Sequence, residues 1–243
     1  MHTLTRWVAG WASGWASRWV TTSGARFVAT ARLLLLLLLL LIASLALPAA
    51  IESTYAAELP LSKVFSDQPA GEYTLDRAHA SVVWRVAHMG LSRYTARFDK
   101  MDGKLDFRPS SAASSSVEFT IETPSVNTGL APFNRQLMDA DWFDGVKHPT
   151  IRFRSTKMDA TGGNMYRLTG DLTLRGTTKP VVWNVTFNGG LYNSLMQGHA
   201  VGFSARTTLK RSEWGMTKLV PMVADEVEVE VEVEFVNQNK PVG

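Results

Sequence analysis

The sequence predicts an all-β domain, an antiparallel sheet of about eight strands with one short helical segment, preceded by an N-terminal signal segment. Two observations support this fold class. Residues 226–235 alternate without interruption between acidic and apolar side chains, and shorter alternating runs of apolar and polar residues, separated by turn residues, occur from residue 71 onward. Successive side chains of a strand point to opposite faces, so each run has one dry and one wet face. This pattern is typical of antiparallel sheets that cover an apolar interior.

The terminal strand also has a well-defined register. Its two faces are Val227, Val229, Val231, Val233 and Phe235 on one side, and Glu228, Glu230, Glu232 and Glu234 on the other. As a helix, the same residues would spread carboxylates around the whole cylinder. A shift of the pairing register by one residue would turn the four glutamates toward the apolar side, and burying unpaired carboxylates is too costly for most folds. The chain is therefore expected to end in a strand that covers something apolar.

The other strands follow from shorter alternating runs between turns. We expect them at residues 71–76, 81–88, 97–107, 117–124, 150–158, 166–174, 181–188 and 198–209. Residues of one parity, such as Val82, Trp84 and Val86, should face inward. The interior of an eight-stranded barrel can be filled by its own side chains or can hold one small ligand.

Residues 130–144 depart from the strand pattern. Pro132 can start a helix, and Phe133 and Leu137 recur on one face of it. Trp142 and Phe143 follow at once. Our hypothesis is a plug or lid over one barrel end; the alternative is a routine covering helix packed on the core.

The first 56 residues differ from the rest and indicate an export signal. They contain four arginines but no acid before Glu52, and a leucine run at 33–41. We expect cleavage after Ala56 and a periplasmic location. The alternative is an uncleaved inner-membrane anchor, because residues 33–51 form an uncharged stretch of 19 residues. The expected organisation is then a flexible lead-in at 57–70, a barrel domain at 71–238 and a tail at 239–243.

Composition excludes several classes of function. The chain has no cysteine, which excludes disulfides, thiolate catalysis, thiolate metal sites and a lipid-modified cysteine. Its net charge of +3 comes from the leader: removing four arginines and Glu52 from totals of 25 basic and 22 acidic residues leaves 21 of each. A neutral domain without a basic stripe is not expected to bind nucleic acid.

No catalytic set or metal site is visible in the sequence. The histidines after the leader, His79, His88, His148 and His199, form no recognisable ligand pair. His79 follows Asp76 at a turn and is expected to be structural. His88 shares the parity of the inward residues, but no acid or nucleophile can be placed beside it, so we predict no catalytic residue and no metal.

Several short motifs follow one another in a fixed order along the chain. They are Tyr-Thr-Leu-Asp-Arg-Ala-His at 73–79, Val-x-Trp-x-Val-x-His-Met-Gly-Leu-Ser at 82–92, Ser-Val-Asn-Thr at 125–128, Asp-Trp-Phe-Asp at 141–144, His-Pro-Thr-Ile-Arg-Phe at 148–153, the stretch 170–180 beginning Gly-Asp-Leu, and Arg-Ser-Glu-Trp-Gly at 211–215. Together they resemble the YceI-like family of bacterial polyisoprenoid-binding proteins. Each motif is weak alone, but their order and spacing are specific. The resemblance covers about residues 71–236.

This resemblance implies a lipocalin-like antiparallel barrel in the periplasm, with a hydrophobic tunnel for an isoprenoid chain such as a quinone tail or polyprenyl lipid. It implies that the protein has no cofactor. Its expected partner is an isoprenoid or related lipid, and it would contact the membrane transiently. The tunnel wall would be formed by Trp84, Val86, Phe119, Ile121, Phe153, Leu172, Trp183 and Phe203. The gate would be formed by Phe133, Leu137, Trp142 and Phe143. For each wall residue the alternative is ordinary core packing.

The chain departs from the family pattern at three places: Trp84 replaces the usual phenylalanine, Ala96 a common glycine, and Asn134-Arg135 an Arg-Asp pair. Such changes in bulk would reshape the tunnel rather than the fold. Our main hypothesis is a periplasmic protein that carries or sequesters an isoprenoid or related lipid without covalent chemistry. Two alternatives stay open: an enzyme that acts on an amphipathic substrate with His88 as acid or base, and a solid barrel that binds other proteins.

Overall fold

The computed structural model describes residues 61–237. The predicted signal segment (1–56) and tail (239–243) lie outside the described residues. Along the chain, the strands are β1 (Gly71–Leu75), β2 (Ser81–His88), β3 (Ser92–Phe98), β4 (Met101–Phe107), β5 (Ser116–Glu122), β6 (Val126–Asn127), β7 (Thr150–Gly162), β8 (Met165–Leu174), β9 (Thr177–Asn193), β10 (Gly198–Lys210) and β11 (Val223–Asn237). The helical elements are η1 (Phe65–Asp67), η2 (Arg77–His79), η3 (Ala112–Ser114), η4 (Thr123–Ser125), α2 (Ala131–Leu137) and η5 (Arg211–Trp214).

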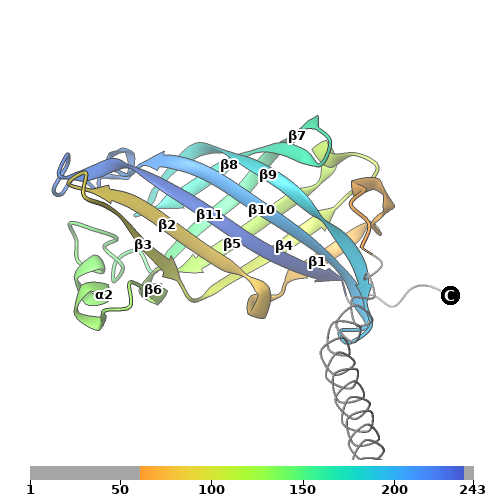
Figure 1. Cartoon of the computed structure of the whole chain (residues 1–243), viewed down its shortest axis with the longest axis horizontal. Helices are drawn as coiled ribbons and strands as arrows, with labels where there is room; N and C mark the ends of the chain where they lie inside the picture. The colour runs from red at the N-terminus through yellow and green to blue at the C-terminus, as the bar shows by residue number, and fades with distance from the viewer. Residues whose placement is uncertain (1–60, 238–243) are drawn as a thin grey trace, which may run out of the picture. The chain divides into compact units, whose positions relative to one another are not determined.

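The strands close into an antiparallel barrel, which confirms the predicted fold class (Figure 1). The ring runs β1-β4-β5-β7-β8-β9-β10-β11, and β11 closes it by pairing with β1. One edge of β11 pairs with two strands in turn. Its residues 223–232 pair with β2, and Phe235 and Val236 pair with β1. Strand β11 is thus paired on both edges, with β10 on one side and with β2 and β1 on the other.

The terminal strand has the predicted register. Val229 lies opposite Trp84 of β2 and Thr207 of β10, while Glu230 lies opposite Arg206. The valines of β11 face the interior of the barrel and its glutamates face outward, as the alternation predicts. The predicted inward faces of β8 and β9 likewise include buried Leu172, Leu174 and Trp183.

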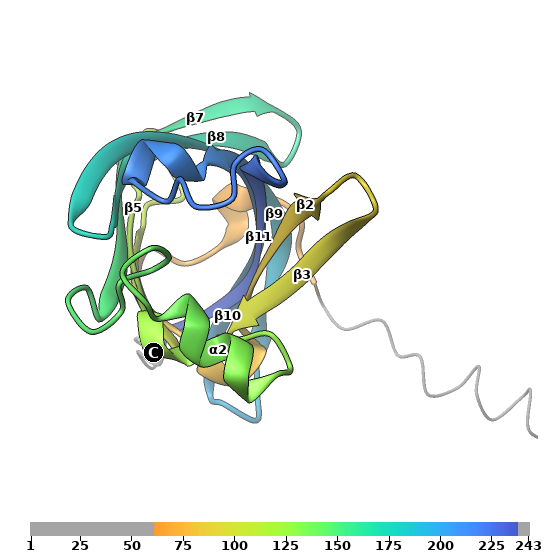
Figure 2. The same ribbon diagram turned by 90° about the vertical axis from the view of Figure 1, so that its left-hand side faces the viewer.

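The β2–β3 hairpin leans away from the ring at the end of the barrel where α2 lies (Figure 2). Strand β3 pairs with β2 along its length, but with β6 only at Arg97–Asn127 and Phe98–Val126. Helix α2 lies against β6, next to this short junction between β3 and β6. The helix starts at Ala131 with Pro132 in its first turn, and it is shorter than the expected region 130–144.

Two expectations differ from the structure. The run 97–107 is not one strand but the end of β3 and the whole of β4, because the outward pair Asp99-Lys100 breaks the alternation between buried Phe98 and Met101. The lead-in before residue 71 was expected to be flexible, but residues 61–68 pack against the barrel. Ser62 forms a bridge with Gly190, and Phe65 is buried because its ring finds partners inside the barrel.

Candidate ligand-binding cavity

The barrel is hollow. A cavity of about 580 Å³ lies inside it, lined almost wholly by apolar side chains from the inward faces of the strands. Cavities of roughly 300–1,000 Å³ with such walls are typical of small-molecule sites. Val227, Val229 and Val231 are only partly buried although they face inward, because they border this space rather than packed side chains.

An aromatic cluster closes the end of the cavity near residue 65. The ring of Phe65 lies 4.5 Å from Phe107, 5.1 Å from Tyr166 and 5.4 Å from Phe187, measured between centroids. Phe107 and Phe187 are fully buried. We call Phe65, Phe107, Tyr166 and Phe187 the aromatic floor. Sequence reasoning missed Phe65, because its contacts join residues far apart in the chain.

The helical segment closes the other end. Phe133 and Leu137, one turn apart on α2, line the cavity, as do Trp142 and Phe143. Phe133 lies 5.4 Å from Tyr94 of β3, and Phe143 lies 5.5 Å from Phe98. We call this group of four residues, with the backbone that carries it, the lid.

Two arginines hold the backbone at the lid end. Arg175, in the turn between β8 and β9, donates through Nη1 to the carbonyl of Ala140 at 2.9 Å and to that of Trp142. Arg211 is 5 % exposed and donates to four carbonyls of the segment 216–224 at 2.7–2.9 Å. Its guanidinium carbon lies 5.8 Å from the centre of the Trp142 ring. Burial lowers the pKa of Arg211, and the nearby Asp225 partly opposes this.

All twelve predicted wall and gate residues line the cavity. Whether they contact a ligand stays a prediction. The structure adds residues that the sequence reasoning did not name, above all Arg211 and Trp214, which lie together in η5 and both line the cavity. Their motif was visible in the sequence, but only the fold brings it to the lid.

His88 lies on the exposed rim of the cavity, at the end of β2. Within residues 61–237 its ring makes no hydrogen bond or ion pair. Among the described residues that line the cavity, none is acidic, and Tyr94, His88 and Arg211 are the ones with a titratable side chain. A general base with a paired acid is therefore not assembled there.

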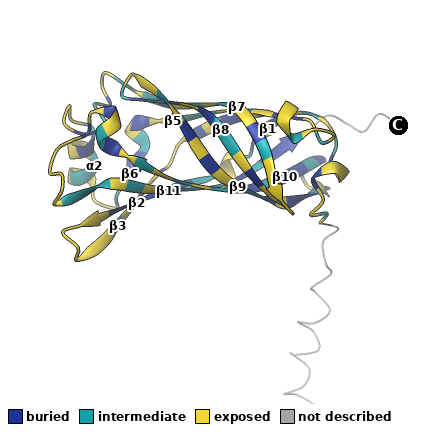
Figure 3. Ribbon diagram, turned by 90° about the horizontal axis from the view of Figure 1, so that it is seen from above, coloured by how far each residue is buried: buried dark blue, intermediate teal, exposed yellow. Residues whose placement is uncertain are grey.

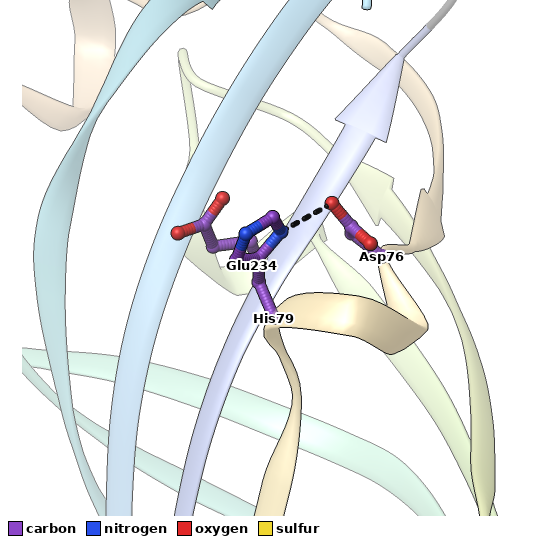
Figure 4. A group of neighbouring side chains, drawn as sticks. All are labelled: Asp76, His79 and Glu234. Carbon is purple, nitrogen blue, oxygen red and sulfur yellow. Dashed lines mark hydrogen bonds and ion pairs between the residues drawn. The ribbon is translucent and has the colours of Figure 1, made fainter.

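A separate polar group lies on the outside of the barrel, where η2 meets β11 (Figure 4). Asp76, His79 and Glu234 each offer one ligand atom, all within 4.8 Å of one another. Asp76 Oδ2 lies 2.8 Å from His79 Nδ1, and Asp76 Oδ1 accepts from the backbone N–H of Ala78. The hydrogen bond and charge of Asp76 raise the pKa of His79. Since Asp76 already caps η2, this group explains why the turn forms, in agreement with the structural role expected for His79.

Within the described range, no helix is both long and apolar enough to cross a bilayer. A sequence model of the YceI-like domain matches residues 73–235. A UPF0312 protein of Vibrio cholerae is 34% identical over 171 residues, which span 70% of this chain and 89% of that protein. A UPF0312 protein of Ectopseudomonas mendocina is similar to the same extent.

Solved structures share the fold. The crystal structure of BcnA from Burkholderia cenocepacia has 29% sequence identity and a TM-score of 0.60, over 66% of this chain and 98% of that one. A polyisoprenoid binding domain from Saccharophagus degradans has 16% identity and a TM-score of 0.53, over 68% and 97% of the two chains.

Proposed function

The chain belongs to the family of YceI-like domains, and from this membership and its hollow barrel we propose that it binds a long apolar lipid, an isoprenoid or a related chain, inside the cavity. The observation that carries the proposal is the cavity of about 580 Å³ between the aromatic floor and the lid, with its apolar wall. A solved barrel of the same fold is described as a polyisoprenoid binding domain, which supports the same class of ligand.

Burial of the hydrocarbon supplies the affinity. Each CH₂ removed from water contributes roughly 0.8 kcal/mol before the cost of ordering the chain. A few isoprene units therefore suffice for stable binding. The wall residues, such as Trp84, Phe153 and Trp183, provide apolar contact area for the hydrocarbon chain, and these contacts do not depend on the identity of the head group.

We propose carriage or sequestration rather than turnover. The support is the chemistry of the lining: within residues 61–237 the cavity wall contains no acidic side chain, and His88 has no partner on the rim. Lipid exchange needs no bond to be made or broken, which fits such a wall.

The test is organic extraction of protein produced from the full chain in a bacterial host, followed by mass spectrometry. We expect a long-chain lipid in amounts comparable to the protein. Ala205 of β10 lines the cavity, so Ala205→Phe should cut the recovered lipid to less than about half by filling the space. Ala87→Phe is the matched control, because Ala87 of β2 is exposed. If the extracts of the wild type, the Ala205→Phe variant and the Ala87→Phe variant all lack lipid, the proposal is wrong.

We further propose export to the periplasm and transient contact with a membrane during lipid exchange. The leader at residues 1–56 supports export, and the intact mass measured in the same experiment distinguishes cleavage after Ala56 from retention of an anchor at 33–51. The membrane contact is supported by apolar side chains exposed around the lid end, among them Met89, Leu91 and Met222.

A further inference from the structure

The segment 61–68 packs on the end of the barrel opposite α2 and belongs to none of its strands (Figure 1). It lies before residues 73–235, the range that the family model matches. Its short helix η1 carries Phe65, which is buried and lines the cavity. The other three rings of the aromatic floor belong to the barrel strands β4, β8 and β9. Phe65 is therefore a cavity residue that neither the barrel strands nor the matched domain supply.

The ring of Phe65 stands between the cavity and two further rings. Of the four residues of the aromatic floor, Phe65 and Phe107 line the cavity, whereas Tyr166 and Phe187 do not. Tyr166 and Phe187 nevertheless lie 5.1 and 5.4 Å from Phe65, measured between ring centroids. Phe187 is also fully buried. The Phe65 ring thus covers both of these side chains and ends the cavity at this point.

Strand β9 provides the contact surface that holds this segment. Ser62 and Gly190 exchange two backbone hydrogen bonds, of 3.0 and 2.8 Å. A Cβ built on Gly190 would lie 2.2 Å from Gln68 Oε1, and one built on Gly189 would lie 2.7 Å from Leu61 Cδ1. Gln68 is itself buried. Two consecutive glycines thus leave the space in which both ends of the segment pack, and this packing fixes the position of Phe65 between them.

The cavity volume indicates how long a chain it can bury. An apolar cavity of about 150 Å³ holds one benzene ring, which is roughly 25 Å³ for each carbon atom. At this density, the cavity of about 580 Å³ holds roughly 23 carbon atoms, or about four to five isoprene units. Replacing Phe65 by alanine removes a ring of six carbon atoms, which frees room for about one further unit.

We propose that the segment 61–68 is a plug, and that Phe65 limits the length of the isoprenoid tail that the barrel buries to about four to five units. The tail ends against the Phe65 ring. Any further unit stays in water and adds nothing to the affinity, because only buried hydrocarbon contributes. The inference rests on the proposed function, since the barrel must bind a lipid before its length can be selected.

The test is a competition among prenyl alcohols that share a head group and differ in length: geraniol, farnesol, geranylgeraniol, geranylfarnesol and hexaprenol. An equimolar mixture is incubated with protein produced from the full chain, and the bound alcohols are quantified by mass spectrometry. For each alcohol, the amount bound to a variant is divided by the amount bound to the wild type. This ratio cancels the differences in solubility among the alcohols.

Phe65→Ala should raise the ratio for hexaprenol at least about tenfold above the ratio for farnesol, because burial of two further CH₂ groups already gives such a factor. Phe65→Leu is the milder variant, and it decides the test if the alanine variant does not fold. We expect it to raise the same ratio about threefold or more. Phe153→Leu is the matched control. Phe153 lines the side of the cavity on β7, so this substitution widens the cavity without lengthening it, and the ratio should stay within about twofold.

The outcomes separate this proposal from the proposed function. If the wild type binds none of the alcohols, the proposed function and the length limit are both wrong. If the wild type binds them but the Phe65 variants bind long and short alcohols in the wild-type proportions, the plug is wrong while lipid binding stands. If Phe153→Leu favours hexaprenol as strongly as Phe65→Leu does, the total volume of the cavity sets the length, and the role of Phe65 is wrong.

Discussion

At the scale of single residues, Gly170 of β8 marks a place in the barrel wall that leaves no room for a side chain. A Cβ built on Gly170 of β8 would lie 2.4 Å from the carbonyl oxygen of Arg154 and 2.5 Å from the ring of Phe153, a predicted wall residue. Contacts this short do not occur between real atoms, so a side chain at this position forces the Phe153 ring and the β7 backbone to move. Gly170 thus positions part of the cavity wall.

Gly170→Ala should lower the free energy of unfolding by roughly 1–3 kcal/mol, because the added methyl overpacks the junction of β7 and β8. Gly202→Ala in β10 is the matched control. Its Cβ would meet no atom closer than 3.7 Å, and we expect a change below about 1 kcal/mol. Urea unfolding of the two variants checks this, and equal losses would contradict it.

At the scale of elements, charged side chains join neighbouring strands on the outer surface. Glu230 of β11 pairs with Arg85 of β2 at 2.8 Å and with Arg206 of β10 at 3.0 Å, so one carboxylate bridges three strands. The hydrogen bond from Arg85 has the largest effect and lowers the pKa of Glu230. Burial, the next largest effect, opposes it, and the charge and hydrogen bond of Arg206 lower the pKa further. The stabilisation from this bridge is present above the ordinary pKa of a glutamate and is lost as the pH falls through the lowered value.

Replacement of Glu230 by Gln should therefore flatten the pH dependence of stability on the acid side. We expect the variant to be less stable than the wild type near neutral pH, with the difference in stability narrowing as the pH falls below the ordinary pKa of a glutamate. Glu226→Gln is the control, since Glu226 lies on the same strand, is exposed and has no ion pair among residues 61–237. Denaturant unfolding of the wild type and both variants at several pH values measures this difference in the free energy of unfolding. If the difference between the wild type and Glu230→Gln does not change with pH, the ion pairs of Glu230 do not stabilise the fold.

The elements themselves could largely be predicted, because strand alternation is a local property. The direction of Val229 or Trp183 follows from its neighbours in the chain, so inward parity places these residues on the interior. The split of the run 97–107 was missed, although the two consecutive outward residues Asp99-Lys100 carried the signal. What no local pattern could supply was the contact of Phe65 with Phe187, or the reach of Arg211 to the carbonyl of Ala224. The first depends on the assembled barrel, and the second on the fold of the connection between β10 and β11.

At the scale of the whole molecule, the two ends of the barrel differ in what they present to solvent. At the lid end, the tip of the β2–β3 hairpin meets the loop before β11, since the N–H of Met89 donates to the carbonyl of Met222 at 2.7 Å. Leu91 at this tip is 83% exposed, and Figure 3 shows the projecting end of the hairpin as exposed. The lid end of the barrel thus carries exposed apolar side chains that water solvates poorly.

If this end touches a membrane, Leu91→Asp should weaken binding to phospholipid vesicles by about fivefold or more, because a charge must then enter the lipid interface. Leu195→Asp is the control: Leu195 is 94% exposed, but it lies in the turn between β9 and β10 at the opposite end. Vesicle flotation measures both. Equal binding by the wild type and the Leu91 variant would exclude this orientation.

Neighbouring strands of the barrel wall differ in how many residue pairs join them. Two of its junctions are held by two residue pairs each, β1 with β11 and β3 with β6, whereas the other neighbours pair over longer ladders. Both junctions border the cavity, the first through Phe235 and the second through Phe98. Separating β3 from β6 breaks few backbone hydrogen bonds. If the barrel binds a lipid tail longer than its cavity, we expect the wall to part first at one of these two short junctions.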